Sequence, residues 1–357
     1  MSHQMAAGYG VPATDSAGSE QPTSTAAGNR PPGARLFAAE VLVLGFGILA
    51  LITYAALGVP LRNPLSLWWV RIRHAAVLYS AGMLLALFFV RLADIHANRQ
   101  GPRRVSRADS LARYRFQYLN RAAIVEDLRL LNAVAVMFTV FLHLKHLIPF
   151  LRKTMLDELL FEHERGLLGG RLAGEWLIDW LGVHSAPFWS GVYKSFYLYI
   201  AMCLIGIVLS RDRRFVRTFY AAFIATWFVG VLLVFALPTM GPCFSTPQLF
   251  ANLPPTAVSD MQQKLLVHRD FVALHPFDSR GLYLISGLPS LHLAVPILIS
   301  LFLGKKSRLV ATASWLFCLL TAVATLYFGW HFVVDDVAAC LLAVGIWKLA
   351  WVGSRIE

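Results

Sequence analysis

Eight long apolar stretches, separated by polar loops, constrain this chain of 357 residues more than any other feature. A helix needs about 20 predominantly apolar residues to cross the hydrocarbon core of a bilayer. The stretches that we predict to cross lie at about 36–59, 72–92, 130–151, 193–210, 218–237, 289–303, 309–328 and 333–351. Charged residues make up only 15% of the chain, whereas soluble domains hold about 25%. This composition excludes a soluble enzyme, a disordered protein and a nucleic-acid-binding module. It predicts an all-α integral membrane protein with about eight transmembrane helices.

The basic residues are distributed unevenly among the predicted loops. With the N-terminus inside, the inner loops carry Lys and Arg at about four times the density of the outer loops. Lys and Arg accumulate on the cytoplasmic side of membrane proteins, and this bias sets their orientation. The net charge of +12 then reflects cytoplasmic loops and not a nucleic-acid-binding surface. We expect a plasma (inner) membrane protein with both termini in the cytoplasm.

Composition also divides the chain into three parts. Residues 1–34 are rich in Gly, Ala, Ser, Thr and Pro, so they cannot bury a core and we expect a disordered cytoplasmic tail. Residues 35–129 hold two spans and a basic cytoplasmic segment, and residues 130–357 hold the other six spans. The outer loops 152–192 and 238–286 are long, and long ordered loops are often functional.

Two polar clusters fall at the predicted outer ends of two spans. Ser290 and His292 follow Pro289 at the start of the sixth span, and His331 and Asp335 lie at the start of the eighth. The predicted topology places both clusters at one depth on the same face of the membrane. Ionisable residues at membrane depth are functional hypotheses by default.

The spacing of His331 and Asp335 suits nucleophilic catalysis. Four residues apart on a helix, both would lie on one face, and a carboxylate fixes the tautomer of a neighbouring imidazole. A histidine held in this way can attack phosphorus and form a phosphohistidine. His292 could protonate the leaving oxygen and then activate the acceptor. Ser290 and the free N–H groups of a helix that begins at Pro289 would hold the phosphate oxygens.

The same side chains allow other interpretations. Two histidines and one aspartate could form a metal site, or a proton relay in a proton-coupled membrane transporter. A transporter, however, places its ionisable residues near mid-membrane between internal repeats, and no repeat is visible here. Asp336 could replace Asp335, although at five residues from His331 it should point away from the imidazole.

Two further polar groups have simpler interpretations. We interpret His143-x-x-His146 with Lys145, near the outer end of the third span, as an interfacial polar patch, although the two histidines could be metal ligands. We interpret Glu162-His163-Glu164 in the outer loop as a solvated face.

The two clusters resemble motifs of a known family, the type-2 phosphatidic acid phosphatase superfamily. Its middle motif, Pro-Ser-Gly-His, is similar to Pro289-Ser290-Leu291-His292, and its last motif ends His-x-x-x-Asp, as do His331 to Asp335. The resemblance covers about residues 130–351. It implies a six-helix membrane core with two added N-terminal helices, and catalytic His331, His292 and Asp335 on the outer face.

The sequence departs from the family pattern at several positions. Ala324-Thr325 stands where the family has Ser-Arg, and Leu237 to Pro242 replaces its Lys-x-x-x-x-x-x-Arg-Pro motif. Leu291 and the stretch from Leu156 to Phe161 resemble the inositol phosphorylceramide synthase (inositolphosphotransferase) branch, which transfers a phosphoinositol head group between sphingolipid and other lipids. Position alone then selects the basic residues that could bind phosphate: Lys194, Arg280 and Lys264.

The resemblance implies an enzyme of lipid metabolism, a lipid phosphotransferase or lipid phosphate phosphatase. Water as acceptor makes it a phosphatase, and a lipid or sugar hydroxyl makes it a transferase. We expect a lipid phosphoester as substrate, a hydroxyl acceptor and a membrane environment. We expect no nucleic acid, no cofactor and no metal ion.

Overall fold

The computed structural model describes residues 36–100, 105–210, 212–278, 280 and 282–353, which form helices and no strands. The predicted tail at 1–34 lies outside these residues. The α-helices are α1 (Ala38–Leu57), α2 (Pro64–Gln100), α3 (Arg107–Tyr118), α4 (Arg121–His146), α5 (Ile148–Leu151), α6 (Asp157–Leu167), α7 (Ala173–Leu181), α8 (Ala186–Lys194), α9 (Phe196–Val208), α10 (Arg213–Ala236), α11 (Pro242–Ser245), α12 (Ala257–Leu274), α13 (Leu291–Leu303), α14 (Arg308–Tyr327) and α15 (Val333–Gly353). Single 3-10 turns lie at Val183–Ser185 and Pro247–Phe250.

Six helical segments of the described chain are long and apolar enough to cross a membrane. They are Ala38–Leu57, Pro64–Arg99, Arg121–Leu151, Val183–Val208, Arg213–Ala236 and Arg308–Tyr327. The chain is therefore a multi-pass membrane protein. Two predicted spans correspond to α13 and α15, which are not among the six. The 13 residues of α13 extend about 20 Å, less than the roughly 30 Å of hydrocarbon, so the count of eight spans stays a prediction.

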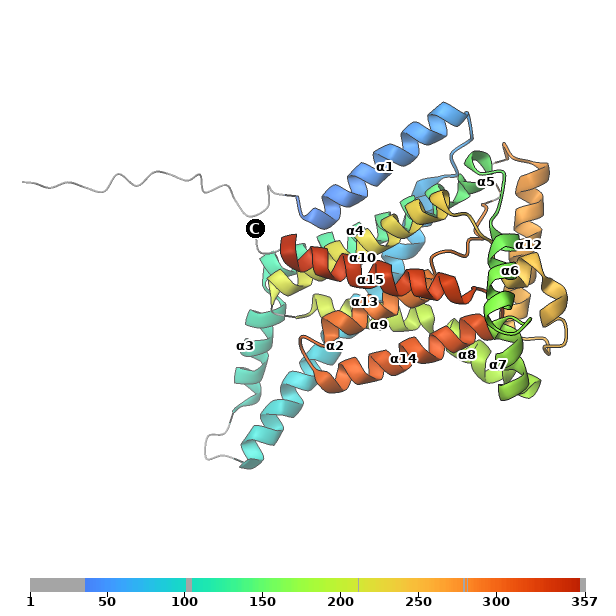
Figure 1. Cartoon of the computed structure of the whole chain (residues 1–357). Coiled ribbons are helices and arrows are strands. Elements are labelled where there is room, and N and C mark those ends of the chain that lie inside the picture. Colours follow the sequence, from blue (N-terminus) through green and yellow to red (C-terminus); the bar gives the residue numbers. More distant parts are fainter. Residues whose placement is uncertain (1–35, 101–104, 211, 279, 281, 354–357) are drawn as a thin grey trace, which may run out of the picture. The chain divides into compact units, whose positions relative to one another are not determined.

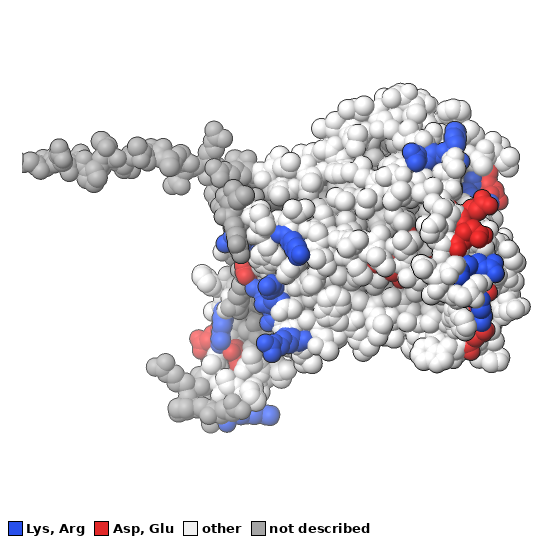
Figure 2. All heavy atoms as spheres, viewed as in Figure 1, with Lys and Arg blue, Asp and Glu red and all other residues white. Residues whose placement is uncertain are grey.

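The long helices run between the two ends of the helical bundle (Figure 1). At one end lie α6, α7 and α12, and at the other end lies α3. Figure 2 shows that the charged side chains on the visible face gather mostly at these two ends, with a broad uncharged belt between them. This distribution fits a bilayer around the belt, because a charged side chain in hydrocarbon is costly.

The helices differ in how far their neighbours cover them. Over its most apolar window, α10 is 61% buried, whereas α1 is 17% buried and α2 11%. The fully buried rings of Phe219, Phe223 and Phe228 lie on α10, which packs against α1, α4, α13 and α15. The two N-terminal helices therefore lie at the edge of the bundle, and α10 lies at its centre.

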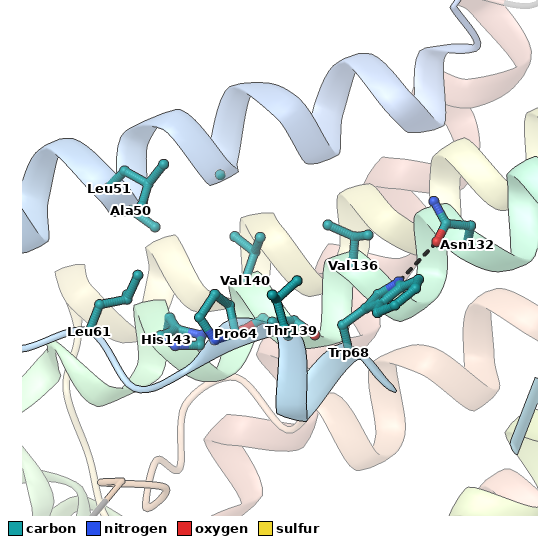
Figure 3. A pocket seen from close by; sticks show the side chains of 12 residues that line it. Ala50, Leu51, Leu61, Pro64, Trp68, Asn132, Val136, Thr139, Val140 and His143 are labelled. Atoms are coloured by element: carbon teal, nitrogen blue, oxygen red, sulfur yellow. Dashed lines mark hydrogen bonds between the residues drawn. The ribbon is translucent and has the colours of Figure 1, made fainter. Parts of the chain in front are cut away.

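An apolar cavity of about 430 Å³ lies between α1, α2 and α4 (Figure 3). Its polar lining is already engaged: Trp68 Nε1 donates to Asn132 Oδ1 at 2.9 Å, and the His143 ring nitrogens lie 2.8 and 2.9 Å from the carbonyls of Thr139 and Arg62. The free surface of the cavity is thus hydrocarbon, which suits lipid chains and not phosphate chemistry. None of the predicted site residues lines it.

The predicted polar patch at the end of α4 is wrong for its two histidines. His143 and His146 are each 3% exposed, and His146 Nδ1 accepts the backbone N–H of Tyr283 at 2.9 Å. They are buried because α1 and the segment before α13 cover this face of α4. Tyr54 of α1 donates its hydroxyl to the His143 carbonyl at 3.2 Å.

Candidate active site

The turn after α14 sets the position of His331. The N–H of Trp330 donates to the carbonyl of Thr325 at 2.9 Å, and that of Gly329 donates to Leu326 at 3.0 Å. Gly329 has a φ of 66°. This pair of bonds around a left-handed glycine is the Schellman motif that commonly ends helices. It stops α14 abruptly, so that His331 follows at the end of the bundle where α6 lies.

His331 and Asp335 form a buried pair. The imidazole Nδ1 lies 3.2 Å from Asp335 Oδ2, and the two side chains are 4% and 0% exposed. Asp335 Oδ2 also accepts the N–H of Phe332 at 3.1 Å. Because α15 begins only at Val333, His331 precedes the helix, and the two residues do not share a helical face as predicted. They meet because Asp335 reaches back from the first turn, as the acidic residue of a capping box does.

The start of α13 supplies unpaired hydrogen-bond donors. Ser290 has an extended backbone with ψ of 96°, so α13 begins at Leu291 and not at Pro289 as predicted. The N–H of Ser290 donates to the carbonyl of Asp335 at 3.1 Å, which joins the two motifs. The N–H groups of Leu291 and His292 donate to no described residue. They remain available at a helix N-terminus, where anions bind readily.

His292 lies beside His331. The centroids of the two imidazole rings are 5.8 Å apart. His292 is also in contact with the rings of Tyr193 and Phe196, at centroid distances of 4.9 and 4.7 Å. These aromatic neighbours fix the orientation of His292 without using either ring nitrogen, so the nitrogens can exchange protons. The described residues contain no group of three or more His, Cys, Asp or Glu side chains that could hold a metal ion.

The prediction of a solvated face at 162–164 is wrong for Glu164, which is 7% exposed. Its Oε1 accepts the N–H of Ala173 at 2.9 Å, and its Oε2 accepts that of Val333 at 2.7 Å. These two residues are the first of α7 and α15. A single carboxylate therefore caps two helices, and its negative charge also complements their N-terminal dipoles.

Asp157, at the start of α6, holds a second loop of the site. Its carboxylate accepts the N–H of Met240 and of Gly241, at 2.8 to 3.0 Å. Gly241 has a φ of 102°, and a Cβ at this position would lie 2.2 Å from the carbonyl oxygen of Trp330. Only glycine permits this approach. The loop at 237–242 is thus packed directly against the residues before His331.

The acids of α6 lie within electrostatic reach of Asp335. Burial raises the pKa of Asp157 and of Glu164, and the negative charge of Asp335 raises both further. The N–H donors described above oppose this effect on each pKa. In the folded state, both carboxyls therefore hold a proton more readily than they would in water.

The three basic residues chosen from the sequence make no hydrogen bond and no ion pair with His331 among the described residues. Lys194 and Lys264 are exposed. The side chain of Arg280 is 81% exposed, and its Nη2 lies 2.6 Å from Asp278 Oδ2.

Sequence reasoning also missed Asp157 and Glu164 as parts of the site. Their spacing of seven residues, which places both on one face of a helix, was the available signal.

Comparison with known proteins gives a family match for part of the chain. Residues 172–349 match the family model of the PAP2 superfamily. No curated protein and no solved structure matches the chain. The chain is therefore a multi-pass membrane protein that carries a PAP2 superfamily domain, the domain of membrane phosphatases and phosphotransferases. The matched segment contains His292, His331 and Asp335, but it begins after Asp157 and Glu164.

Proposed function

We propose that this chain transfers the phosphorus of a lipid phosphoester through a phosphohistidine at His331. The observation that carries the proposal is the His331 imidazole, whose Nδ1 is engaged by Asp335 and whose ring lies 5.8 Å from His292. Because Nδ1 is engaged, Nε2 is the nitrogen left to attack. The second imidazole is close enough for one phosphorus to lie between the two rings.

In the first step, Nε2 of His331 attacks phosphorus, and the bond from phosphorus to the leaving alcohol oxygen breaks. His292, in its protonated form, gives its proton to that oxygen. Asp335 stabilises the positive charge that develops on His331. In the second step, an acceptor hydroxyl attacks phosphorus and the P–N bond breaks. The proton of the acceptor passes to His292, which restores the starting state.

The start of α13 stabilises the phosphate oxygens during both steps. The N–H groups of Leu291 and His292 and the hydroxyl of Ser290 are donors at one helix N-terminus. Preorganised donors of this kind act on charge that develops in the transition state, and losing one commonly costs about 10²–10³ in rate.

Within this reaction class we propose head-group transfer of the inositolphosphotransferase type. The support is the resemblance of Leu291 and of the stretch from Leu156 to Phe161 to that branch. The stretch includes Asp157, which holds the loop at Gly241 against Trp330. The residues that carry the resemblance therefore lie at the site and not in a distant part of the chain.

Trapping of the covalent intermediate tests the reaction. The full chain, in detergent micelles, is incubated with ³²P-phosphatidic acid or with phosphatidylinositol labelled with ³²P and tritiated inositol. We expect protein-bound ³²P that is stable in alkali and labile in acid, absent in His331→Ala and present in His268→Ala, whose histidine is exposed on α12. Wild-type turnover in His331→Ala would overturn the mechanism. Tritium bound together with ³²P supports head-group transfer, and ³²P without tritium contradicts it.

We further propose that the site faces outward across a plasma membrane, with both termini in the cytoplasm. The density of Lys and Arg in the predicted inner loops supports this orientation. A reporter fused after Glu357 should be active only on the cytoplasmic side. Activity on the opposite side would reverse the orientation and place the site on the inner face.

A further inference from the structure

The loop after α10 is bonded to two parts of the candidate site. The carbonyl of Pro238 accepts the N–H of Leu156, just before α6, at 2.9 Å. Cys243, in the first turn of α11, donates its N–H to the carbonyl of Gly329 at 2.7 Å, in the turn that precedes His331. Together with the bonds to the α6 carboxylate described above, these contacts fix the loop between α6 and the residues before His331.

Thr239, in the middle of this loop, holds a third part of the site. Thr239 is 2% exposed. Its carbonyl accepts the N–H of Gly287 at 2.7 Å, and its Oγ1 accepts the N–H of Leu288, also at 2.7 Å. Backbone N–H groups require a partner when they are buried. A single residue therefore fixes two consecutive residues of the segment that leads into α13.

Gly287 in turn lies beside the carboxylate that engages the nucleophile. A Cβ at Gly287 would lie 2.4 Å from Thr239 Oγ1 and 3.2 Å from Asp335 Oδ2. Asp335 Oδ2 is the oxygen that lies 3.2 Å from His331 Nδ1. The backbone at Gly287 is therefore packed between the threonine hydroxyl and the reactive pair, and a side chain at this position would displace one of them.

The same segment contacts Asp335 a second time. The N–H of Ser290 donates to the Asp335 carbonyl at 3.1 Å, and α13 begins at the next residue. A displacement of the segment would therefore move both Asp335 and the first N–H groups of α13 relative to His331. A misplacement of about 1 Å can cost on the order of 10²-fold in rate.

We propose that Thr239 is a positioning residue for the reaction at His331, a role that rests on the proposed function. Its carbonyl and hydroxyl hold Gly287 and Leu288 in place, and this segment holds Asp335 against the His331 imidazole. Thr239 acts through these residues and not on the substrate. It therefore affects the rate of the chemical step more than it affects substrate binding.

Substitutions of Thr239 test the hydroxyl separately from the shape of the side chain. Thr239→Val keeps a branched side chain but leaves the buried N–H of Leu288 without an acceptor, whereas Thr239→Ser keeps the hydroxyl. With ³²P-phosphatidic acid or phosphatidylinositol, whichever the wild type turns over, we expect phosphoenzyme formation in Thr239→Val to slow about 10- to 10²-fold. Because kcat and kcat/KM should fall together, KM should stay nearly unchanged. Thr239→Ser should retain most of the wild-type rate.

Tyr220→Phe is the control for a general loss of stability. The hydroxyl of Tyr220 donates to the Leu204 carbonyl at 2.9 Å. Tyr220 lies near the start of α10, whereas Thr239 follows the end of that helix. Both substitutions remove one buried hydrogen bond, so both should lower the thermal midpoint of unfolding. Only Thr239→Val should also slow phosphoenzyme formation.

A double-mutant cycle tests the contact between Thr239 and Gly287. In Gly287→Ala the new methyl group meets Thr239 Oγ1, so we expect a loss in kcat of about tenfold or more. That oxygen is absent when Gly287→Ala is combined with Thr239→Ala, so the combined loss should be smaller than the product of the two single losses. Losses that multiply would mean that the two residues act independently, and would overturn the inference. Thr239→Ala also replaces Thr239→Val in the kinetic comparison if the valine variant does not fold.

Other kinetic outcomes would also overturn the inference. They are wild-type kcat in Thr239→Val, a raised KM with unchanged kcat, or an equal fall in kcat in Tyr220→Phe. Each of these results leaves the proposed function standing if the wild type forms the labelled intermediate.

Hydrogen exchange gives a readout that does not depend on turnover. The peptide that contains Leu288 should exchange faster in Thr239→Val than in the wild type or in Tyr220→Phe, because local opening becomes easier. Unchanged exchange would overturn the inference. If no intermediate forms on His331, the proposed function fails, while faster exchange still supports the hold of Thr239 on Leu288.

Discussion

Two sides of the candidate site contribute to it in opposite ways: the motif side, formed by the starts of α13 and α15, and the α6 side. On the motif side, polar atoms are left without partners: Ser290 Oγ and Asp335 Oδ1 are buried and make no hydrogen bond to the described residues. On the α6 side, the carboxylates of Asp157 and Glu164 accept backbone N–H groups through both oxygens. An unsatisfied buried polar atom costs free energy, which a bound substrate can recover. A saturated carboxylate instead fixes the backbone, so the first side is suited to react and the second to support.

The largest loss of activity should follow a substitution on the motif side. Asp335→Asn removes the carboxylate that orients His331, and the analogous change in a serine protease costs about 10⁴ in kcat. We expect a loss of that order in the rate of phosphoenzyme formation, measured by rapid quench. Asp336→Asn is the matched comparison, because no hydrogen bond joins Asp336 to His331. Equal losses in the two variants would contradict the assigned pairing.

A substitution on the α6 side should reduce kcat less than one on the motif side, and it should also reduce stability. In Glu164→Gln, one carbonyl oxygen must serve two N–H groups, and an unsatisfied buried donor costs about 1–3 kcal/mol. Because the start of α15 would shift, we expect kcat to fall up to about 10²-fold. Glu162→Gln, on the exposed face of the same helix, should match the wild type in thermal midpoint and in kcat. A change in kcat without a change in the midpoint would make Glu164 part of the chemistry.

Substitution of an exposed cation should affect turnover less than substitutions on the motif side or on the α6 side. The guanidinium of Arg280 is held by Asp278 and is largely in water, where an ion pair contributes about 0–1 kcal/mol. For Arg280→Ala we expect KM for the phosphoester to rise by less than about tenfold. A rise of 100-fold or more would place Arg280 at the phosphate.

The smallest effect should be a difference in how stability depends on pH. The pKa of Asp157 is raised above the ordinary value of 3.8, so the folded state binds its proton more tightly than the unfolded chain does. This carboxyl therefore stabilises most in acid, and it loses that contribution as pH rises between the unfolded and folded pKa values. The thermal midpoint of wild type minus that of Asp157→Asn should grow from about pH 7 to about pH 4. A shrinking difference would mean that the pKa is lowered.

The sequence was sufficient to predict that His331, Asp335 and His292 lie together. His331, Asp335 and His292 lie close in sequence to helix starts, so a topology in which the starts of α13 and α15 are neighbours brings them together. The prediction erred where the backbone stops being helical. Because Ser290 is extended and α15 begins only at Val333, the two motifs lie at helix ends and not within the first turns.

Spacing alone could not identify Asp157 and Glu164 as parts of the site. Whether Glu164 is solvated or buried depends on which segments cover α6, and these segments are the starts of α7 and α15, nine and 169 residues away. His143 and His146 presented a similar problem. Their place near the predicted outer end of a span suggested a polar patch, and only the packing of α1 and of the segment before α13 against α4 shows that both side chains are buried.

The shared cap at Glu164 also bears on how deep the site lies in the membrane. On α7, Trp176 and Trp180 are 50% and 81% exposed, and exposed tryptophans settle at the level of the lipid head groups. Glu164 joins the first residue of α7 to the first residue of α15, two residues after His331. From the tryptophans we therefore expect His331 to lie near the level of the lipid head groups. Under the proposed function, this depth is the level at which a lipid presents its phosphorus.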